Sequence, residues 1–221
     1  MISLVIEAAT YAGSVALIEG GRVLSERAVA MRGRDHEALM PAVAEVLAER
    51  AVAVARLDRI VCGAGPGSFT SLRIAGGIAK GLAMAAGIPL VPVASLALLV
   101  ASQELLSPAR YLSAIDALRG EHYVSLFDVE EDGAVRQVSG TSLVASARIE
   151  EYAVEQQARL VRAGDPASGG VSPHARAAAK LTKMIDAADA ADLAAWEPAY
   201  GRLAEAQVKW EAAHGRPLAG A

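Results

Sequence analysis

The chain has 221 residues, 53% of them hydrophobic and 21% charged, a balance that excludes an intrinsically disordered protein. The formal net charge of −4 argues against a basic protein that binds nucleic acid on its own. Only two Trp, five Tyr and two Phe residues are present, too few to build a platform for stacking bases.

The sequence predicts a cytoplasmic protein without a membrane segment. Cys62 is the only cysteine, so the chain can form no internal disulfide and no cysteine-based zinc site, which fits a reducing compartment. Residues 1–7 lack the basic start of a signal peptide and resemble a first strand instead. Residues 81–101 carry no charge over about the length of a bilayer-spanning helix, but Gly87 and two prolines interrupt them.

The first half of the chain predicts three strands, then a helix, and then two further strand–helix pairs. Apolar and alternating runs mark the strands, and Gly20-Gly21 marks a hairpin turn between the second and third. Apolar residues at helical spacing mark the helices; Pro41 predicts a kink or a late start in the first, for which Asp35 offers an N-cap. The predicted strands are 3–6, 14–19, 23–30, 59–62 and 89–93. The first predicted helix ends near residue 51, and the other two cover 72–86 and 96–105.

The second half predicts a looser copy of the same order. Its predicted strands are 111–116, 122–128, 134–138 and 159–163, and its predicted helices are 150–157, 174–190 and a last stretch near 203–213. Two such halves indicate an α/β fold of two similar lobes, each with a mixed sheet. We place the lobes at residues 1–103 and 104–221, and the last helix is free to pack back on the first lobe.

A glycine-rich segment between a strand and a helix is the sharpest local pattern. Gly63, Gly65 and Gly67 could expose backbone N–H groups to an anion at the start of the helix. The segment matches neither the P-loop nor the dinucleotide-binding pattern, so a tight turn that only glycine fits is the simpler interpretation. Ser68 and Ser95 are expected to cap the helices that follow them.

The residues that could carry catalysis or bind a metal are scattered. No H-x-x-x-H or H-E-x-x-H pattern occurs, so we predict no metal site and no catalytic residue. Cys62 lies in a strand of the buried type and is expected to fill the core. The four histidines are His36, His122, His174 and His214.

Two glycines lie four residues apart on one side of the predicted helix 72–86. A glycine inside a helix costs about 1 kcal/mol relative to alanine, so Gly77 and Gly81 suggest that another backbone comes close there. That backbone belongs either to the protein's own sheet and helices or to a partner helix.

Six parts of the chain carry distinctive sequence patterns, and the run GAGPGSFTSLRI at residues 63–74 is the most specific of them. The supporting segments are LVIEAAT at 4–10, RDH at 34–36 with LMP at 39–41, PVASL at 92–96, DALRGEHY at 116–123 and PAYGR at 198–202. In this order and spacing the segments resemble the TsaB (YeaZ) family of bacterial tRNA threonylcarbamoyladenosine biosynthesis proteins over nearly the whole chain.

The resemblance implies an actin-like ATPase fold with two related lobes. It also implies a non-catalytic dimerisation subunit that binds and activates a TsaD-like transferase, which modifies the adenosine beside the tRNA anticodon. A TsaE-like ATPase joins this assembly, and tRNA, ATP and metal are reached only through the partner subunits. The isolated chain is expected to form a homodimer through the same helices.

The resemblance assigns residues to two sites. The family pairs through two helices of its first lobe, mapped here on residues 36–47 and 73–86. The implied partner-binding residues are His36, Leu39, Met40, Val43, Leu47, Arg73, Gly77, Lys80, Gly81 and Met84. The implied vestigial nucleotide loop comprises Glu7, Thr10, Gly65, Gly67 and Ser68.

Three departures from the related patterns support a non-catalytic subunit. The run Glu7-Ala8-Ala9 stands where family members commonly have Asp-Thr-(Ala or Ser). Ser71 stands where the family usually has glycine. Ser95 and Leu99 stand where the catalytic paralogues have two metal-binding histidines, and leucine cannot bind a metal.

The alternative hypothesis is an ATP-dependent small-molecule kinase of the same fold. It would need acids such as Glu7 and Asp116 to hold Mg²⁺ and ATP. A peptidase has no support, because no metal motif, catalytic triad or nucleophile elbow is present.

Overall fold

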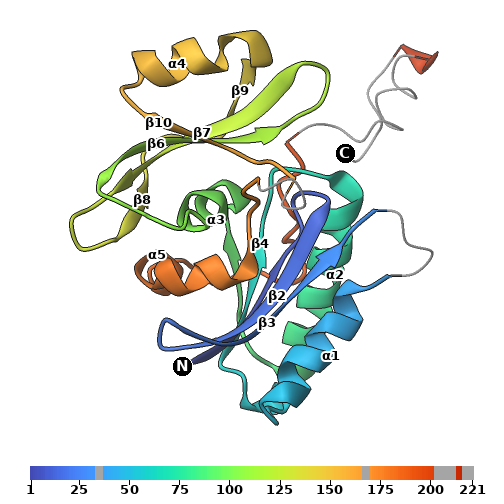
Figure 1. Cartoon of the computed structure of the whole chain (residues 1–221). Helices are drawn as coiled ribbons and strands as arrows, with labels where there is room; N and C mark the ends of the chain where they lie inside the picture. Colours follow the sequence, from blue (N-terminus) through green and yellow to red (C-terminus); the bar gives the residue numbers. More distant parts are fainter. Residues whose placement is uncertain (33–36, 166–169, 202–212, 216–221) are drawn as a thin grey trace.

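Two mixed β-sheets and the helices between and outside them form five layers (Figure 1). The computed structural model describes residues 1–32, 37–165, 170–201 and 213–215. Helices α1 and α2 cover the outer face of the first sheet, and α4 covers the outer face of the second (Figure 1). Helices α3 and α5 lie between the two sheets (Figure 1).

The first sheet has the strand order β3-β2-β1-β4-β5. Strands β1, β2 and β3 pair antiparallel, whereas β1, β4 and β5 pair parallel. The strands are β1 (Ile2–Glu7), β2 (Ala12–Glu19), β3 (Arg22–Ala30), β4 (Arg59–Gly63) and β5 (Leu90–Val93). The helices of this lobe are α1 (Leu39–Glu49), α2 (Phe69–Ala86) and α3 (Ser95–Ala101), with a short 3-10 helix η1 (Val54–Arg56) before β4. The predicted element order of the first half is therefore confirmed.

The second sheet has the order β10-β6-β7-β8, and β9 also pairs with β7. The parallel pair β10–β6 and the antiparallel strands β6, β7 and β8 repeat the arrangement of β4, β1, β2 and β3. The strands are β6 (Ala109–Asp116), β7 (Glu121–Val129), β8 (Val135–Gln137), β9 (Ser142–Ala145) and β10 (Arg159–Arg162). A 3-10 helix η2 (Ser146–Arg148) leads into α4 (Ile149–Glu155). The two predicted mixed sheets are confirmed, while β9 was missed.

The start of α1 shows how a local signal sets an element. The helix begins at Leu39, so Pro41 lies within its first turn, where a missing backbone donor costs little. The carboxylate of Glu37 accepts hydrogen bonds from the N–H groups of Leu39 and Met40. The predicted N-cap, Asp35, lies outside the described residues.

Alternation along the strands divides the core of the first lobe. Leu4 and Ile6 face α1 and α2, whereas Val5 points to the opposite side, toward α3. Cys62 is fully buried on the α1–α2 side, and this burial raises the pKa of its thiol. The prediction that Cys62 fills the core is therefore confirmed.

Helix α3 explains the uncharged stretch in the sequence. All seven of its residues are buried, and its side chains belong to the core that both sheets share. A helix that is apolar on every side is expected inside a protein as well as inside a bilayer. Within the described ranges, no helix combines the length and apolarity needed to cross a membrane.

After β10 the chain returns to the first lobe. The 3-10 helix η4 (Ala175–Lys180) and the short helix α5 (Thr182–Asp186) pack against the inner face of the first sheet. Ala175 N–H donates to the hydroxyl of Ser14 at 2.9 Å, and Arg59 pairs with Asp186 at 2.8 Å. The predicted lobe 104–221 thus contains a segment that packs on the other lobe.

The prediction of one helix over residues 174–190 is wrong. The buried residues Ala175, Ala178 and Leu181 recur at a spacing of three, which the three-residue turn of a 3-10 helix places on one side. Packing on the sheet therefore overrides the helix propensity of the alanines. Of the predicted last helix near 203–213, only residue 213 lies within the described part of the chain.

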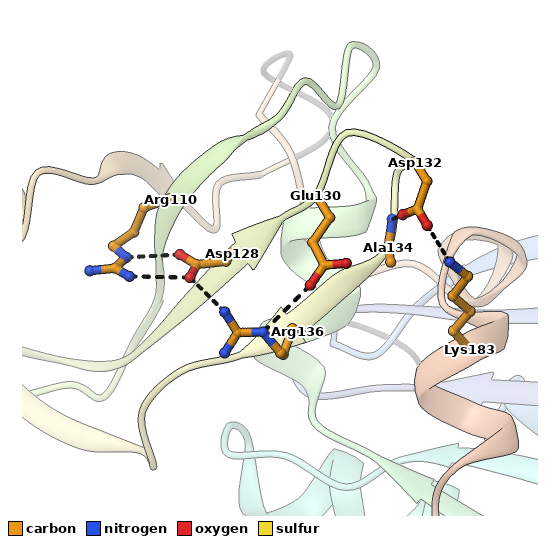
Figure 2. Close-up of polar contacts among 7 residues, drawn as sticks. All are labelled: Arg110, Asp128, Glu130, Asp132, Ala134, Arg136 and Lys183. Atoms are coloured by element: carbon orange, nitrogen blue, oxygen red, sulfur yellow. Dashed lines mark hydrogen bonds and ion pairs between the residues drawn. The ribbon is translucent and has the colours of Figure 1, made fainter.

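A row of charges crosses the outer face of the second sheet (Figure 2). Asp128 lies directly opposite Arg110 on β6 and Arg136 on β8, so one carboxylate serves both guanidinium groups. Arg110 donates from Nε at 2.8 Å and Nη2 at 3.1 Å, and Arg136 donates from Nη2 at 3.0 Å. Arg136 also pairs with Glu130, and Lys183 of α5 pairs with Asp132 beside it (Figure 2).

We expect Asp128→Asn to lower stability slightly at neutral pH and to have no effect in strong acid. The hydrogen bond from Arg110 holds the pKa of the Asp128 carboxyl below its usual range. Stability from a lowered carboxyl pKa is present above the ordinary pKa and disappears as the pH falls through the folded value. Urea unfolding of both proteins across the acid range measures this, and an equal difference at every pH would contradict it.

Candidate functional site

Three loops meet where the parallel strands β1, β4 and β5 end. In a sheet of this kind the carboxyl ends of parallel strands lie at one edge, where ligands of α/β proteins are usually bound. Thr10 follows β1, the rest of the glycine-rich segment, residues 64–68, follows Gly63 at the end of β4, and Ser95 follows β5. The implied vestigial nucleotide loop is therefore brought together in the structure, from two of these three loops.

Glu7 is fully buried at this junction and is already engaged by the protein. One carboxylate oxygen accepts the Ala9 N–H at 2.6 Å, and the other accepts the Ser95 hydroxyl at 2.9 Å. Burial raises the pKa of the Glu7 carboxyl to about 7. A Cβ added to Gly63 would lie 1.7 Å from Glu7 Oε2, so the glycine makes room for this acid.

The glycine-rich loop uses its backbone groups internally. Gly65 N–H donates to Ser95 Oγ at 3.1 Å, and Ser68 N–H donates to the Ala9 carbonyl at 2.7 Å. A Cβ on Gly65 would lie 2.4 Å from the carbonyl oxygen of Ala199, and one on Gly67 would lie 2.1 Å from that of Ala9. Close backbone approach therefore accounts for these glycines, as the tight-turn interpretation predicted.

The predicted capping roles of the two serines are wrong. Ser68 stands at the N-cap of α2 but makes no side-chain cap bond, because its hydroxyl pairs with that of Ser71 at 3.0 Å. Ser95 is already the first residue of α3, and its hydroxyl connects Glu7 with Gly65. The Ser95 hydroxyl therefore connects the end of β1 with the loop after β4, whereas the Ser68 hydroxyl bonds within the first turn of α2.

We expect Gly67→Ala to destabilise the protein by about 2 kcal/mol, because the new methyl group would overlap the Ala9 carbonyl. Gly140→Ala is the matched control, since no described atom lies within 4 Å of a Cβ at that exposed position. Urea unfolding gives both values, and equal stabilities of the two variants would contradict the close approach.

A cleft of about 2230 Å³ opens between the lobes at this junction. Thr10, Gly67 and Ser68 line it from the first lobe, and Asp116 and Arg119 line it from the second. Its volume exceeds the roughly 300–1,000 Å³ of ordinary small-molecule sites. The cleft is therefore a wide opening between the two lobes, lined by residues of both.

Of the two acids that a kinase would need, only one faces the cleft. Asp116 lines the cleft and accepts the Leu118 N–H at 2.7 Å, whereas Glu7 is buried behind the loops. Across the described ranges, no three His, Cys, Asp or Glu side chains gather closely enough to hold a metal. Leu99 lies in the core, so an apolar side chain fills the position that the resemblance equates with the second metal-binding histidine.

The outer side of α2 is exposed, and two of its positions are glycines. No described atom lies within 4 Å of a Cβ built on Gly77 or Gly81, so neither glycine serves a close contact with the part of the chain that the structure describes. Packing against the protein's own sheet, one of the two open interpretations, is therefore wrong. The neighbouring Gly76 faces the other way, and its Cβ would lie 3.0 Å from Pro198.

The structure corrects the assignment of the α1 residues. Leu39, Val43 and Leu47 are buried against the sheet, because apolar residues at helical spacing form the core-facing stripe. They cannot contact a partner while α1 stays folded. Met40 is 43% exposed on the opposite side, and His36 lies outside the described residues.

The α2 residues divide between two sides of the helix. Arg73 and Met84 are exposed on the same side as the two bare glycines, and Met84 is 66% exposed. Lys80 lies half-buried on the flank, where its Nζ donates to the Trp196 carbonyl at 2.9 Å. Seven of the exposed residues of these two helices are called the docking face below: Met40, Pro41, Ala44, Arg73, Gly77, Gly81 and Met84.

Comparisons with known proteins agree with this geometry. A family model described as "TsaD: tRNA N6-adenosine threonylcarbamoyltransferase" matches residues 30–195. The fold is that of the actin-like ATPases, with two related lobes, as predicted. Fold and family match together define an actin-like protein related to these transferases.

The named relatives are more specific. The chain is 30% identical to the tRNA threonylcarbamoyladenosine biosynthesis protein TsaB of Bacillus subtilis, over 95% of this chain and 98% of that protein. It is 36% identical to TsaB of Haemophilus influenzae over 55% of this chain and 52% of that protein. The solved structure "YeaZ from Pseudomonas aeruginosa" superposes with a TM-score of 0.73 at 26% identity, covering 90% and 99% of the two chains. The chain belongs to the TsaB (YeaZ) family.

Proposed function

We propose that this chain is a non-catalytic subunit of tRNA threonylcarbamoyladenosine biosynthesis, which binds and activates a TsaD-like threonylcarbamoyltransferase. The observation that carries the proposal is the docking face, where two helical glycines are exposed and contact nothing within the described chain. The names of the relatives and the family match support the pathway.

The energetics of α2 favour a partner on this face. Each helical glycine costs about 1 kcal/mol relative to alanine, and neither Gly77 nor Gly81 gains an internal contact in return. Because the distance between two packed helix axes depends on the side chains at the contact, two glycines without side chains let a second helix approach closely. The flexible Met40 and Met84 of the docking face can adapt to an apolar partner surface.

The partner is a TsaD-like paralogue that offers its equivalent pair of helices. The family resemblance implies this pairing, and the match of the transferase family model to residues 30–195 supports a related surface on both proteins. Activation then follows from differential contact, since a subunit that binds the competent conformation of the transferase more tightly shifts its population.

The junction of loops supports a non-catalytic role. Glu7 is enclosed by Ala9 and Ser95, and Ser95 and Leu99 replace the paralogues' metal-binding pair. ATP, metal and tRNA are accordingly assigned to the TsaD-like and TsaE-like partners. In the absence of the partner, the docking face of one copy can cover that of a second copy, giving a homodimer.

The test is reconstitution with the purified TsaD-like partner. We expect a stable complex and a threonylcarbamoyl transfer to tRNA that depends on adding this chain, with no ATP turnover by this chain alone. Absence of a complex would overturn the proposal. ATP turnover by the isolated chain that is lost in Asp116→Asn would favour the kinase alternative instead.

A further inference from the structure

We propose that residues 196–201, here called the strap, form a brace through which the second lobe fixes the orientation of α2. The proposal rests on the proposed function, because α2 carries most of the docking face. It makes Tyr200 and Gly201 positioning residues for a partner that need not touch them.

The strap begins along the flank of α2. The Lys80 ammonium donates to the Trp196 carbonyl at 2.9 Å, one helical turn from Gly76. A Cβ on Gly76 would lie 3.0 Å from Pro198 Cγ and 3.6 Å from Trp196 Cζ3, so the strap is pressed against the helix backbone. These contacts lie beside the docking face and leave it open.

The middle of the strap holds the start of α2 and the loop before it. Ala199 N–H donates to the Ala64 carbonyl at 2.7 Å, which adds the strap to the end of β4. The rings of Tyr200 and Phe69 meet with their centroids 4.5 Å apart, in the favourable range for aromatic pairs. Phe69 is the first residue of α2, so this contact acts at the end of the helix.

The far end of the strap is held by the second lobe. Gly201 has a φ of +77°, and a Cβ there would lie 2.5 Å from the ring of Tyr123 and 3.0 Å from Pro66. The Tyr123 hydroxyl donates to the Tyr200 carbonyl at 3.4 Å. Tyr123 is a buried residue of β7, so the strap connects the second sheet directly with α2.

These three supports explain how α2 is oriented. The first sheet contacts the inner side of the helix, and the strap contacts its flank and its first residue. The strap therefore gives a direct route by which a displacement at Tyr123 reaches α2. The second lobe thus has a role in partner binding although the docking face lies entirely on the first.

The test compares Gly201→Ala with Gly133→Ala. Both glycines have a left-handed backbone, with φ of +77° and +80°, but a Cβ at Gly133 meets no described atom within 4 Å. The control therefore carries the same backbone strain without disturbing the strap. Both variants are made with Trp210→Phe, which leaves Trp196 as the only tryptophan and as a reporter of the strap.

We expect Gly201→Ala to expose Trp196 to acrylamide quenching, to speed hydrogen exchange in the first turns of α2, and to weaken partner binding about tenfold. Gly133→Ala should change none of these. If Gly201→Ala does not fold, Tyr200→Leu removes the ring contact with Phe69 and should have the same three effects.

The other outcomes separate the two proposals. Unchanged Trp196 quenching, or exposed Trp196 with unchanged exchange in α2 and unchanged affinity, would overturn the brace. If the wild type does not bind the partner, the proposed function fails, and hydrogen exchange of α2 in the two variants still decides whether the strap orients the helix.

Discussion

Leucine at Gly81 is expected to weaken the complex with the TsaD-like partner by about a hundredfold, and leucine at Gly77 should do the same. Both positions are exposed, and a Cβ at either one meets no described atom within 4 Å, so the start of the larger side chain points into open space. Because leucine is a better helix former than glycine, each variant should fold at least as well as the wild type. The loss therefore arises only when a second helix approaches. Isothermal titration measures the affinity, and thermal unfolding confirms that the variants fold.

The control for both variants is Gly140→Leu. Gly140 is exposed on the second lobe, away from α1 and α2, and no described atom lies within 4 Å of a Cβ there. It adds the same apolar surface elsewhere and should leave partner binding unchanged. Wild-type affinity in both α2 variants would show that the partner does not bind at the docking face. Equal losses in all three variants would point to a nonspecific effect of surface leucines.

Raising the pH from 5 to 8 is expected to cost the wild type about 3 kcal/mol of stability that the Glu7→Gln variant does not lose. Burial is the main cause, because it disfavours the ionised form and raises the pKa of the Glu7 carboxyl to about 7. The amide of glutamine has nearly the same shape and carries no charge at any pH. It can still accept one hydrogen bond from the Ala9 N–H.

The sign follows from the proton balance. The unfolded chain releases the Glu7 proton near the ordinary carboxyl pKa, whereas the folded chain holds it until the pH approaches 7. The stabilising contribution is thus complete below the unfolded pKa and is lost as the pH rises through the folded value. Urea unfolding of both proteins at several pH values gives the difference between their free energies of unfolding. The histidines titrate in both proteins alike, so their contribution cancels in this difference. A constant difference between pH 5 and 8 would show that Glu7 stays ionised in the folded protein.

The order of strands and helices along the chain could be predicted because its signals are local. Apolar runs, the Gly20-Gly21 turn and Pro41 in the first turn of α1 each act within a few residues. Short elements with weak sequence patterns were harder to predict. Strand β9, for example, has only four residues and no alternation of buried and exposed positions. The 3-10 geometry at Ala175 depends on contact with a sheet more than 150 residues earlier in the chain, as its bond to Ser14 shows.

The candidate sites show the same limit. Sequence reasoning found Gly77 and Gly81, because glycine inside a helix is unusual whatever surrounds it. It placed Leu39, Val43 and Leu47 on the wrong surface, since an apolar stripe does not say whether a sheet or a partner covers it. In the sequence, the strap could be recognised only in part, as the motif PAYGR at residues 198–202. Its signal was a constrained proline followed by an aromatic residue and a glycine, and its meaning required the fold.

The buried helix α3 has a consequence for dissecting this protein. Its seven residues form part of one interior shared by both sheets, and the segment around η4 closes that interior from the opposite end of the chain. Cutting between the halves would expose to water the apolar side of α3 that packs on the second sheet. The internal duplication visible in the strand order therefore does not yield two autonomous folding units, and half-length fragments are poor substitutes for the whole.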